Sequence, residues 1–209
     1  KVVVEMKIRE ALFYLFGKVY IDRDKFDIED ETLLHISDTP SQFYPQLSKL
    51  ISIINPNYII HTGDVVDNIK LQIYPSSYAR FKTESLKLLR ILNSSTSSRI
   101  IITKGNHDDL KFLIENGGKI EFVETKSNIT INGIRFAFGH YSEDIKKLDA
   151  DIYLYGHDLS IPSQIYEGRV FLNGISNMHL INLKTREIIN FDYPYGIDNA
   201  RLNRHRLGI

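Results

Sequence analysis

The chain contains no cysteine, which excludes disulfide bonds, thiolate metal sites and cysteine nucleophiles. Any metal ion must therefore be bound by histidine, aspartate, asparagine or glutamate. The 26 basic and 26 acidic side chains cancel, so composition gives no bulk electrostatic reason to expect nucleic acid or an anionic membrane as an obligate partner. No apolar run approaches the roughly 20 residues that cross a bilayer. We expect a soluble, cytoplasmic protein without a membrane partner, and the sequence leaves its oligomeric state open.

The length and composition fit one globular domain. With 209 residues, of which 43% are hydrophobic, the chain is large enough to bury a substantial core. We interpret 1–209 as a single domain with a preface at 1–31, a core at 32–192 and a basic tail at 193–209. No internal repeat or linker divides it.

The preface and the tail differ from the core in pattern. Apolar residues at helical spacing predict a helix that ends at Gly17, and we interpret this helix as a packing or capping element. The tail is interpreted as a solvated helix face or arm, with an arm that contacts phosphate or RNA as the alternative. Its basic residues are Arg201, Arg204, His205 and Arg206.

The core changes character halfway along the chain. Strand-like apolar runs at 33–36, 58–61 and 99–103 alternate with helical patterns, which implies parallel βαβ units and a buried sheet. After residue 115 a largely antiparallel meander of short strands follows, separated by turns such as Asn132-Gly133. We therefore predict an α/β fold, a four-layer α/β/β/α sandwich in which two mixed sheets are flanked by helices.

Polar residues stand at the carboxyl ends of five predicted strands. In open α/β sheets the ligand crevice lies outside these ends, so the five groups should converge. The groups are Ser37-Asp38, Asp64 with Asp67, Asn106-His107-Asp108, His140, and His157-Asp158.

The chemistry of these groups indicates a metal site. Carboxylates, an amide oxygen and imidazoles without thiolate suit Mn, Fe or Zn, and Mg where oxygen ligands dominate. Glycines precede Asp64, Asn106, His140 and His157, and we expect them to permit sharp turns and close approach to a bound ion. Such a donor set is typical of phosphoesterases.

In the order of these motifs the sequence resembles the calcineurin-like metallophosphoesterase family. The family pattern is Asp-x-His, Gly-Asp-x-x-Asp, Gly-Asn-His-Asp or Glu, a later His usually beside Gly, and Gly-His-x-His. The resemblance covers about residues 32–183. It implies a β-sandwich flanked by helices that hydrolyses phosphate esters, and the compact single-domain members suggest a small phosphodiester as substrate.

The resemblance also implies a ligand set for one or two divalent ions. Asp64 would bridge them, and Asp38 would bind the first ion. Asn106, His140 and His157 would complete the shell of the second ion. Mn is the expected metal, with Fe, Zn, Ni or Mg as alternatives.

Three further residues receive roles from the resemblance. His107 would contact the phosphate and protonate or stabilise the leaving oxygen, as the catalytic acid. Asp67 and Asp108 would hold the loops and orient the ligands.

Two motifs depart from the family pattern, and both lost histidines belong to the first ion. The first motif reads Asp38-Thr39-Pro40, and the last reads Gly156-His157-Asp158-Leu159. We expect the first site to be weak or empty; if it fills, its oxygen ligands favour Mg or Mn over Zn. Asp158, beside the gap, is the candidate replacement ligand.

The departure keeps an alternative function open. A catalytically impaired member of the fold could serve as a protein-binding scaffold, or hold a phosphate ligand on a single metal ion without turnover. We expect His61 and His179 to be structural, and we discount His35 as a ligand because strand alternation places it on the face opposite Asp38.

Overall fold

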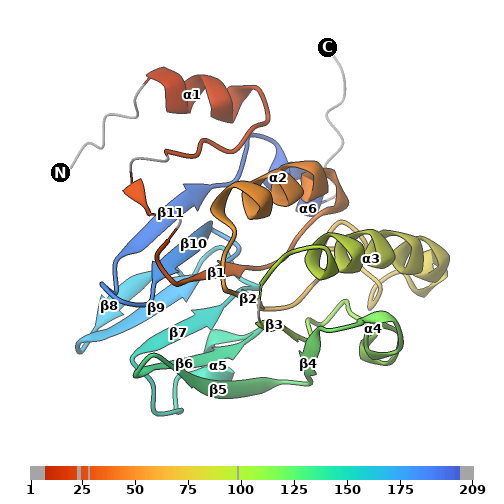
Figure 1. The fold of residues 1–209 in the computed structure, drawn as a ribbon. Coiled ribbons are helices and arrows are strands. Elements are labelled where there is room, and N and C mark those ends of the chain that lie inside the picture. Colours follow the sequence, from red (N-terminus) through yellow and green to blue (C-terminus); the bar gives the residue numbers. More distant parts are fainter. Residues whose placement is uncertain (1–7, 23–24, 28, 98, 203–209) are drawn as a thin grey trace.

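Short apolar strands build two sheets that pack face to face, with helices on their outer sides (Figure 1). The computed structural model describes residues 8–22, 25–27, 29–97 and 99–202. The first sheet has six strands in the order β11-β10-β1-β2-β3-β4, and the second has five in the order β5-β6-β7-β9-β8. The expected sandwich of two mixed sheets flanked by helices is confirmed.

The first sheet contains the predicted parallel strands. β1 pairs in parallel with β2, β2 with β3, and β3 with β4, whereas β10 adds to β1 and β11 to β10 in the antiparallel sense. Strand bounds are β1 Thr32–Ile36, β2 Tyr58–His61, β3 Arg99–Thr103, β4 Glu121–Val123, β10 Asn177–Asn182 and β11 Ile188–Asp192.

The second sheet is less antiparallel than the sequence pattern predicted. β5 pairs with β6, and β8 with β9, in the antiparallel sense, but β6, β7 and β9 run parallel. The reason is that helix α5 (Ser142–Ile145) carries the chain from β6 to β7 in place of a tight hairpin turn. Strand bounds are β5 Lys126–Ile131, β6 Ile134–Gly139, β7 Ile152–Tyr155, β8 Gln164–Tyr166 and β9 Arg169–Asn173.

Period-2 alternation in the strands divides the core into layers. Leu33 of β1 and Ile60 of β2 face the second sheet, while Leu34 and Ile59 face the helices. The outer layer over the first sheet consists of α2 (Tyr44–Ile54), α3 (Tyr78–Asn93) and α4 (Leu110–Asn116), together with the 3₁₀ turns η2 (Ser41–Phe43) and η3 (Pro75–Ser77). Within the described residues, no helix is both long and apolar enough to span a membrane.

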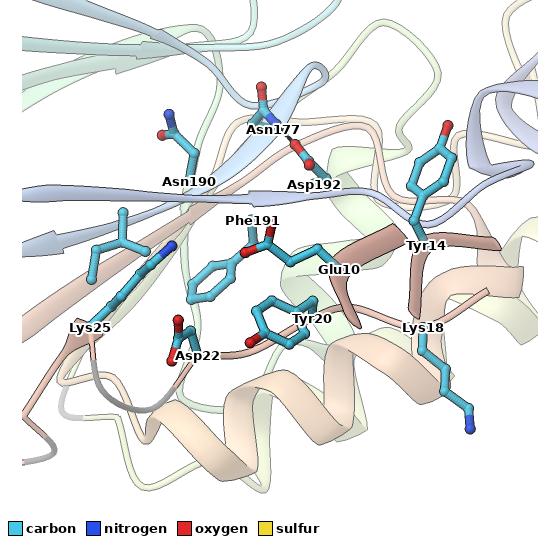
Figure 2. A pocket seen from close by; sticks show the side chains of 11 residues that line it. Glu10, Tyr14, Lys18, Tyr20, Asp22, Lys25, Asn177, Asn190, Phe191 and Asp192 are labelled. Atoms are coloured by element: carbon cyan, nitrogen blue, oxygen red, sulfur yellow. Dashed lines mark hydrogen bonds between the residues drawn. The ribbon is translucent and has the colours of Figure 1, made fainter. Parts of the chain in front are cut away.

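The preface forms the predicted helix, but its apolar face is not packed as the pattern indicated. In α1 (Ile8–Leu15) the side chain of Ile8 is 82% exposed, and Leu12, Leu15 and Phe16 are also exposed. The segment after Gly17 enters the core in its place, through the buried Val19. Between preface and β11 lies a pocket of about 390 Å³, lined by Tyr14, Tyr20, Phe191 and charged groups (Figure 2).

The interpretation of the tail as a solvated arm is wrong for Arg201. This residue ends helix α6 (Ile197–Arg201) and is only 2% exposed. Its guanidinium donates hydrogen bonds to the carbonyls of Asp38 (2.8 Å) and Ile175 (2.7 Å) and packs 4.1 Å from the ring of Tyr193. These bonds tie α6 to the loops after β1 and before β10 and satisfy two buried carbonyls. Arg204, His205 and Arg206 lie outside the described residues.

Replacing Arg201 with alanine is expected to lower the free energy of unfolding by about 2 to 4 kcal/mol, because two buried carbonyls lose a charged donor. Arg80→Ala, at an exposed position of α3, serves as the control and should change it by less than about 0.5 kcal/mol. Urea denaturation followed by circular dichroism measures both. Equal stability of the two variants would contradict the structural role of Arg201.

Candidate metal centre

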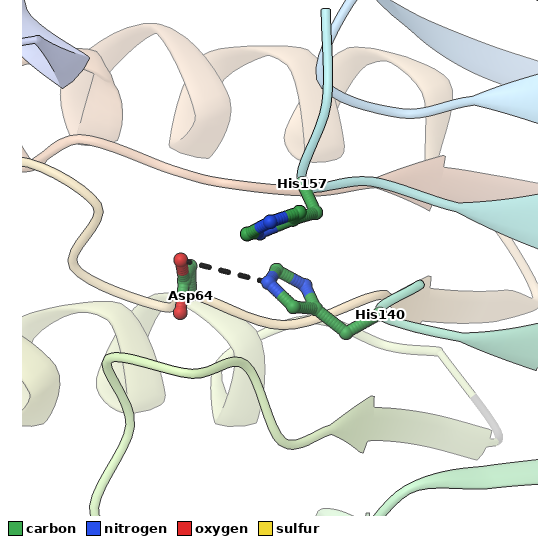
Figure 3. A group of neighbouring side chains, drawn as sticks. All are labelled: Asp64, His140 and His157. Atoms are coloured by element: carbon green, nitrogen blue, oxygen red, sulfur yellow. Dashed lines mark ion pairs between the residues drawn. The ribbon is translucent and has the colours of Figure 1, made fainter. Parts of the chain in front are cut away.

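The carboxyl ends of strands in both sheets bring the predicted ligands to one place. Among the described residues, two groups have ligand atoms within 4.8 Å of one another: Asp64 with His140 and His157, and Asp38 with Asp64 and Asp67. Figure 3 shows the first group, in which both imidazoles point toward the Asp64 carboxylate. Asp64 belongs to both groups, which is the arrangement that a bridging ligand requires.

The histidine half of the site consists of Asp64, Asn106, His140 and His157, and the lone pairs of its ligand atoms face one another. His140 donates its Nδ1 hydrogen to the carbonyl of Thr62 (2.7 Å), which selects the tautomer with a lone pair at Nε2. That nitrogen lies 3.1 Å from Asn106 Oδ1 and 3.6 Å from Asp64 Oδ2. Ligand atoms around one ion at about 2.1 Å are themselves about 3.0 to 3.4 Å apart. These residues therefore fit a divalent cation.

The acidic half of the site consists of Asp38, Asp64 and Asp67, whose negative charges require a nearby positive charge. Asp38, Asp64 and Asp67 are buried together, and burial followed by neighbouring carboxylates raises the pKa of Asp64 well above its usual range. Burial, and then the charge of Asp38, raises the pKa of Asp67 to about 7. Ionised carboxylates at this spacing are costly to bury unless cations neutralise them. The acidic half also fits a cation.

Backbone amides hold the two central loops together through Asp108. Its carboxylate accepts hydrogen bonds from the amides of Asp64 (2.8 Å), Val65 (3.0 Å) and Gly105 (2.8 Å). The Asp64 carboxylate in turn accepts one from the His107 amide (2.9 Å). These hydrogen bonds tie the loop after β2 to the loop after β3, and the functional role of Asp108 remains a prediction.

The ligand loops adopt unusual backbone angles. Asp38, Asp64 and His157 have φ values of 47°, 55° and 70°, in the left-handed region that side chains avoid. Such conformations persist only where the surroundings enforce them. Here hydrogen bonds supply that constraint, since Asp38 Oδ2 accepts from Ser37 Oγ (2.5 Å) and from the His157 amide (3.0 Å).

Two glycines are required because neighbouring loops lie close together. A Cβ on Gly105 would lie 2.1 Å from Asp64 Oδ1, and one on Gly156 would lie 2.0 Å from Ser37 Oγ. The sequence predicted close approach to an ion at these glycines. In the structure, they allow the loops that carry ligands to approach one another.

His107 lies beside the histidine half. Its Nε2 is 3.0 Å from the side-chain nitrogen Nδ2 of Asn106, and its buried Nδ1 has no hydrogen-bond partner among the described residues. Burial, followed by the charge of Lys70, lowers the pKa of His107 to about 4, so the imidazole is neutral at pH 7 without a bound anion.

Among the described residues, Asp67 groups with the carboxylates expected at the first ion, whereas Asp158 as a replacement ligand remains a prediction. Asp158 Oδ1 accepts a hydrogen bond from the Ser160 amide (2.8 Å) in a local turn, and Asp158 belongs to neither ligand group. Asp67 joins Asp38 and Asp64. Sequence reasoning gave Asp67 only a loop-holding role; its spacing of three residues from Asp64 in a turn was the available signal.

Histidines outside the ligand groups form the floor of the site. His35 contacts His179 through their Nδ1 atoms (3.2 Å) and Thr62 Oγ1 through Nε2 (3.1 Å). His61 Nε2 contacts Thr39 Oγ1 at 2.9 Å. Burial lowers the pKa of His61 to about 4 and that of His179 to about 3, so these rings remain neutral. Their contacts agree with the structural roles expected for them.

Tyr141 forms a wall of the site. Its ring centroid lies 4.5 Å from that of His157 and 4.9 Å from that of His140, both in edge-on geometry. The flanking Phe138, Tyr153 and Tyr155 are buried, as expected for core residues.

The fold and site define a metallophosphoesterase-type α/β sandwich. The sequence model of the calcineurin-like phosphoesterase family matches residues 31–164, and the chain belongs to this family. Family membership implies a divalent metal ion and a small phosphoester substrate. No curated protein matches the chain.

Solved structures share the fold at low sequence identity. An archaeal phosphodiesterase has 15% identity and a TM-score of 0.55, and the match covers 76% of this chain and 98% of that one. Yfce, a phosphoesterase from E. coli, has 17% identity and a TM-score of 0.51, with 78% and 98% covered.

Mn²⁺ affinity is expected to increase with pH up to about pH 7, by up to about tenfold per pH unit for each proton displaced. The raised pKa of Asp67, about 7, means that this carboxyl holds a proton in acid that the metal must displace. Titration calorimetry in buffers of different ionisation enthalpy measures affinity and proton release together. Asp67→Asn should flatten part of the profile, and an affinity independent of pH would contradict the assignment.

Proposed function

We propose that this protein is a metal-dependent phosphoester hydrolase that acts on small phosphodiesters, with Mn²⁺ as the preferred metal. The observation that carries the proposal is the convergence of Asn106 Oδ1, His140 Nε2 and Asp64 Oδ2 beside His107. Their lone pairs face one another, and a divalent cation satisfies all three. The likeness in fold to an archaeal phosphodiesterase supports the choice of a diester.

The ligand residues each have a separate task. Asp64 joins the two halves of the site, Asn106, His140 and His157 would hold the second ion, and Asp38 would be a ligand of any cation in the first position. A bound divalent ion would neutralise phosphate oxygens and lower the pKa of the attacking water. Thr62 fixes the tautomer of His140, so that Nε2 is the nitrogen available to metal.

His107 supplies the proton in this proposal. The attacking water gives up one proton to solvent and its oxygen bonds to phosphorus; as the bond to the leaving oxygen breaks, Nε2 gives its hydrogen to that oxygen, which departs as an alcohol. The ring must first be protonated, and its pKa of about 4 in the absence of anion is too low. The charge of a bound phosphate raises this pKa toward neutrality, so protonation and substrate binding are coupled.

The His107→Gln variant is expected to retain its fold and Mn²⁺ binding. Its hydrolysis rate should fall more for substrates whose leaving group is more basic. A nitrophenolate needs little protonation, so bis-nitrophenyl phosphate should lose about 10-fold or less, whereas an ester with an alkyl leaving group should lose about 100-fold or more. Steady-state rates with both substrates and added Mn²⁺ measure this. Metal-independent hydrolysis, or equal loss on both substrates, would contradict the assignment.

A second candidate function is supported by the positions of the lost histidines. Pro40 is buried at the start of η2, and Leu159 is exposed, so neither offers a ligand to the first ion. A scaffold that binds protein partners would have no need of those ligands. Elemental analysis separates the two functions, since an absence of bound metal at millimolar Mn²⁺ favours the scaffold.

A further inference from the structure

The turn after β2 brings a lysine to the acidic half of the site. Lys70 forms an ion pair with Asp67 Oδ1, and its side chain is only 20% exposed. Its backbone is fixed, because the Lys70 carbonyl accepts hydrogen bonds from the amides of Ile73 (2.9 Å) and Tyr74 (2.8 Å). The ammonium group is therefore held beside the carboxylate that lies with Asp38 and Asp64.

The same turn lies against the rest of the site. Gln72 accepts a hydrogen bond from the side-chain amide of Asn106 (3.0 Å). Asn68 accepts one from the Ser41 amide (2.8 Å), next to Pro40, where the family has a histidine. The charge of Lys70 helps to lower the pKa of His107, where it follows burial, and of His157, where it follows burial and the charge of His140, so its field reaches the histidine half as well.

We propose that the Lys70 ammonium takes the place of the first metal ion, so that one divalent ion and one lysine bind the substrate phosphate together. This inference rests on the proposed phosphoesterase function. Lys70 would donate hydrogen bonds to a non-bridging phosphate oxygen on the side where two imidazoles are missing. Lysine is suited to this role because its ammonium is a compact charge with three donors.

With one divalent ion and Lys70 present, the positive and negative charges of the acidic half balance. Asp38, Asp64 and Asp67 contribute three negative charges, and one divalent ion with Lys70 contributes three positive ones. The Asp108 carboxylate is stabilised by three backbone amides, and the charge of Arg201 adds to that of Lys70 at Asp67. A second divalent ion would have to approach the ammonium with only oxygen ligands and without the lost histidines. The single ion and the lysine together avoid that repulsion.

The test replaces Lys70 and counts both metal and phosphate. Lys70→Ala and the longer polar Lys70→Gln remove the charge, and circular dichroism checks that each folds. Lys87→Ala is the matched control, because Lys87 also pairs with an acid three residues away, Glu84, but on the exposed surface of α3. Elemental analysis after equilibrium dialysis gives Mn²⁺ per chain, and calorimetry gives the affinity of the Mn²⁺-loaded protein for inorganic phosphate.

Wild type and the Lys87 control should bind one Mn²⁺ per chain, and both Lys70 variants should keep that ion but bind phosphate about 10- to 100-fold more weakly. Two Mn²⁺ ions in wild type, or unchanged phosphate affinity in the Lys70 variants, would overturn the inference. Either result leaves the proposed function standing if wild type hydrolyses a diester with Mn²⁺. A wild-type protein that neither binds Mn²⁺ nor hydrolyses the diester refutes both.

Discussion

Mutual repulsion among buried carboxylates is the constraint on which this structure depends. Asp38, Asp64, Asp67 and Asp108 lie together at the carboxyl ends of β1, β2 and β3, and each is almost fully buried. Water cannot stabilise their charges, so the protein must do so. Backbone amides donate hydrogen bonds to Asp108, and Lys70 forms an ion pair with Asp67. The left-handed turn at His157 directs its amide to Asp38. The loop conformations follow from this requirement.

Much of this arrangement could be predicted from the sequence because it is local. β-Branched runs such as Ile100-Ile101-Ile102 specify buried parallel strands, and in parallel strands the next residues must lie at the same sheet edge. The convergence of Asp64 and Asn106, which follow β2 and β3, can therefore be expected without any knowledge of side-chain packing, whereas that of His140 and His157 depends on how the second sheet packs on the first. The roles of individual ligands remain predictions, since family membership assigns a fold and a class of reaction.

What could not be predicted depends on contacts distant in sequence. In the linear sequence Arg201 belongs to a basic tail, yet its partners are the carbonyls of Asp38 and Ile175, which the sheet order β11-β10-β1 brings near it. The exposed apolar face of α1 is the opposite case. Helical periodicity there predicts burial, but the segment containing Val19 occupies the available core. Spacing indicates that a face is apolar and does not say what covers it.

The absence of two imidazoles affects both the metal affinity of the first position and the charge balance of the site. A neutral imidazole binds metal without adding charge, so removing two of them weakens the first ion and leaves the carboxylates unneutralised. Evolution of such a site can proceed by losing the carboxylates as well, or by supplying another cation. This chain retains Asp38 and Asp64 and places Lys70 against Asp67.

A lysine differs from a metal ion in what it can do. It neutralises charge and donates hydrogen bonds to phosphate, but it does not lower the pKa of a water molecule as a Lewis acid does. Activation of water would then rest on the ion held by Asn106, His140 and His157 alone. In the proposed assignment this ion has its full set of ligands, and the Thr62 carbonyl fixes the tautomer of one of them, His140. The residues present thus agree with a site in which the histidine half binds the metal ion that activates water and the acidic half, with Lys70, binds the phosphate electrostatically.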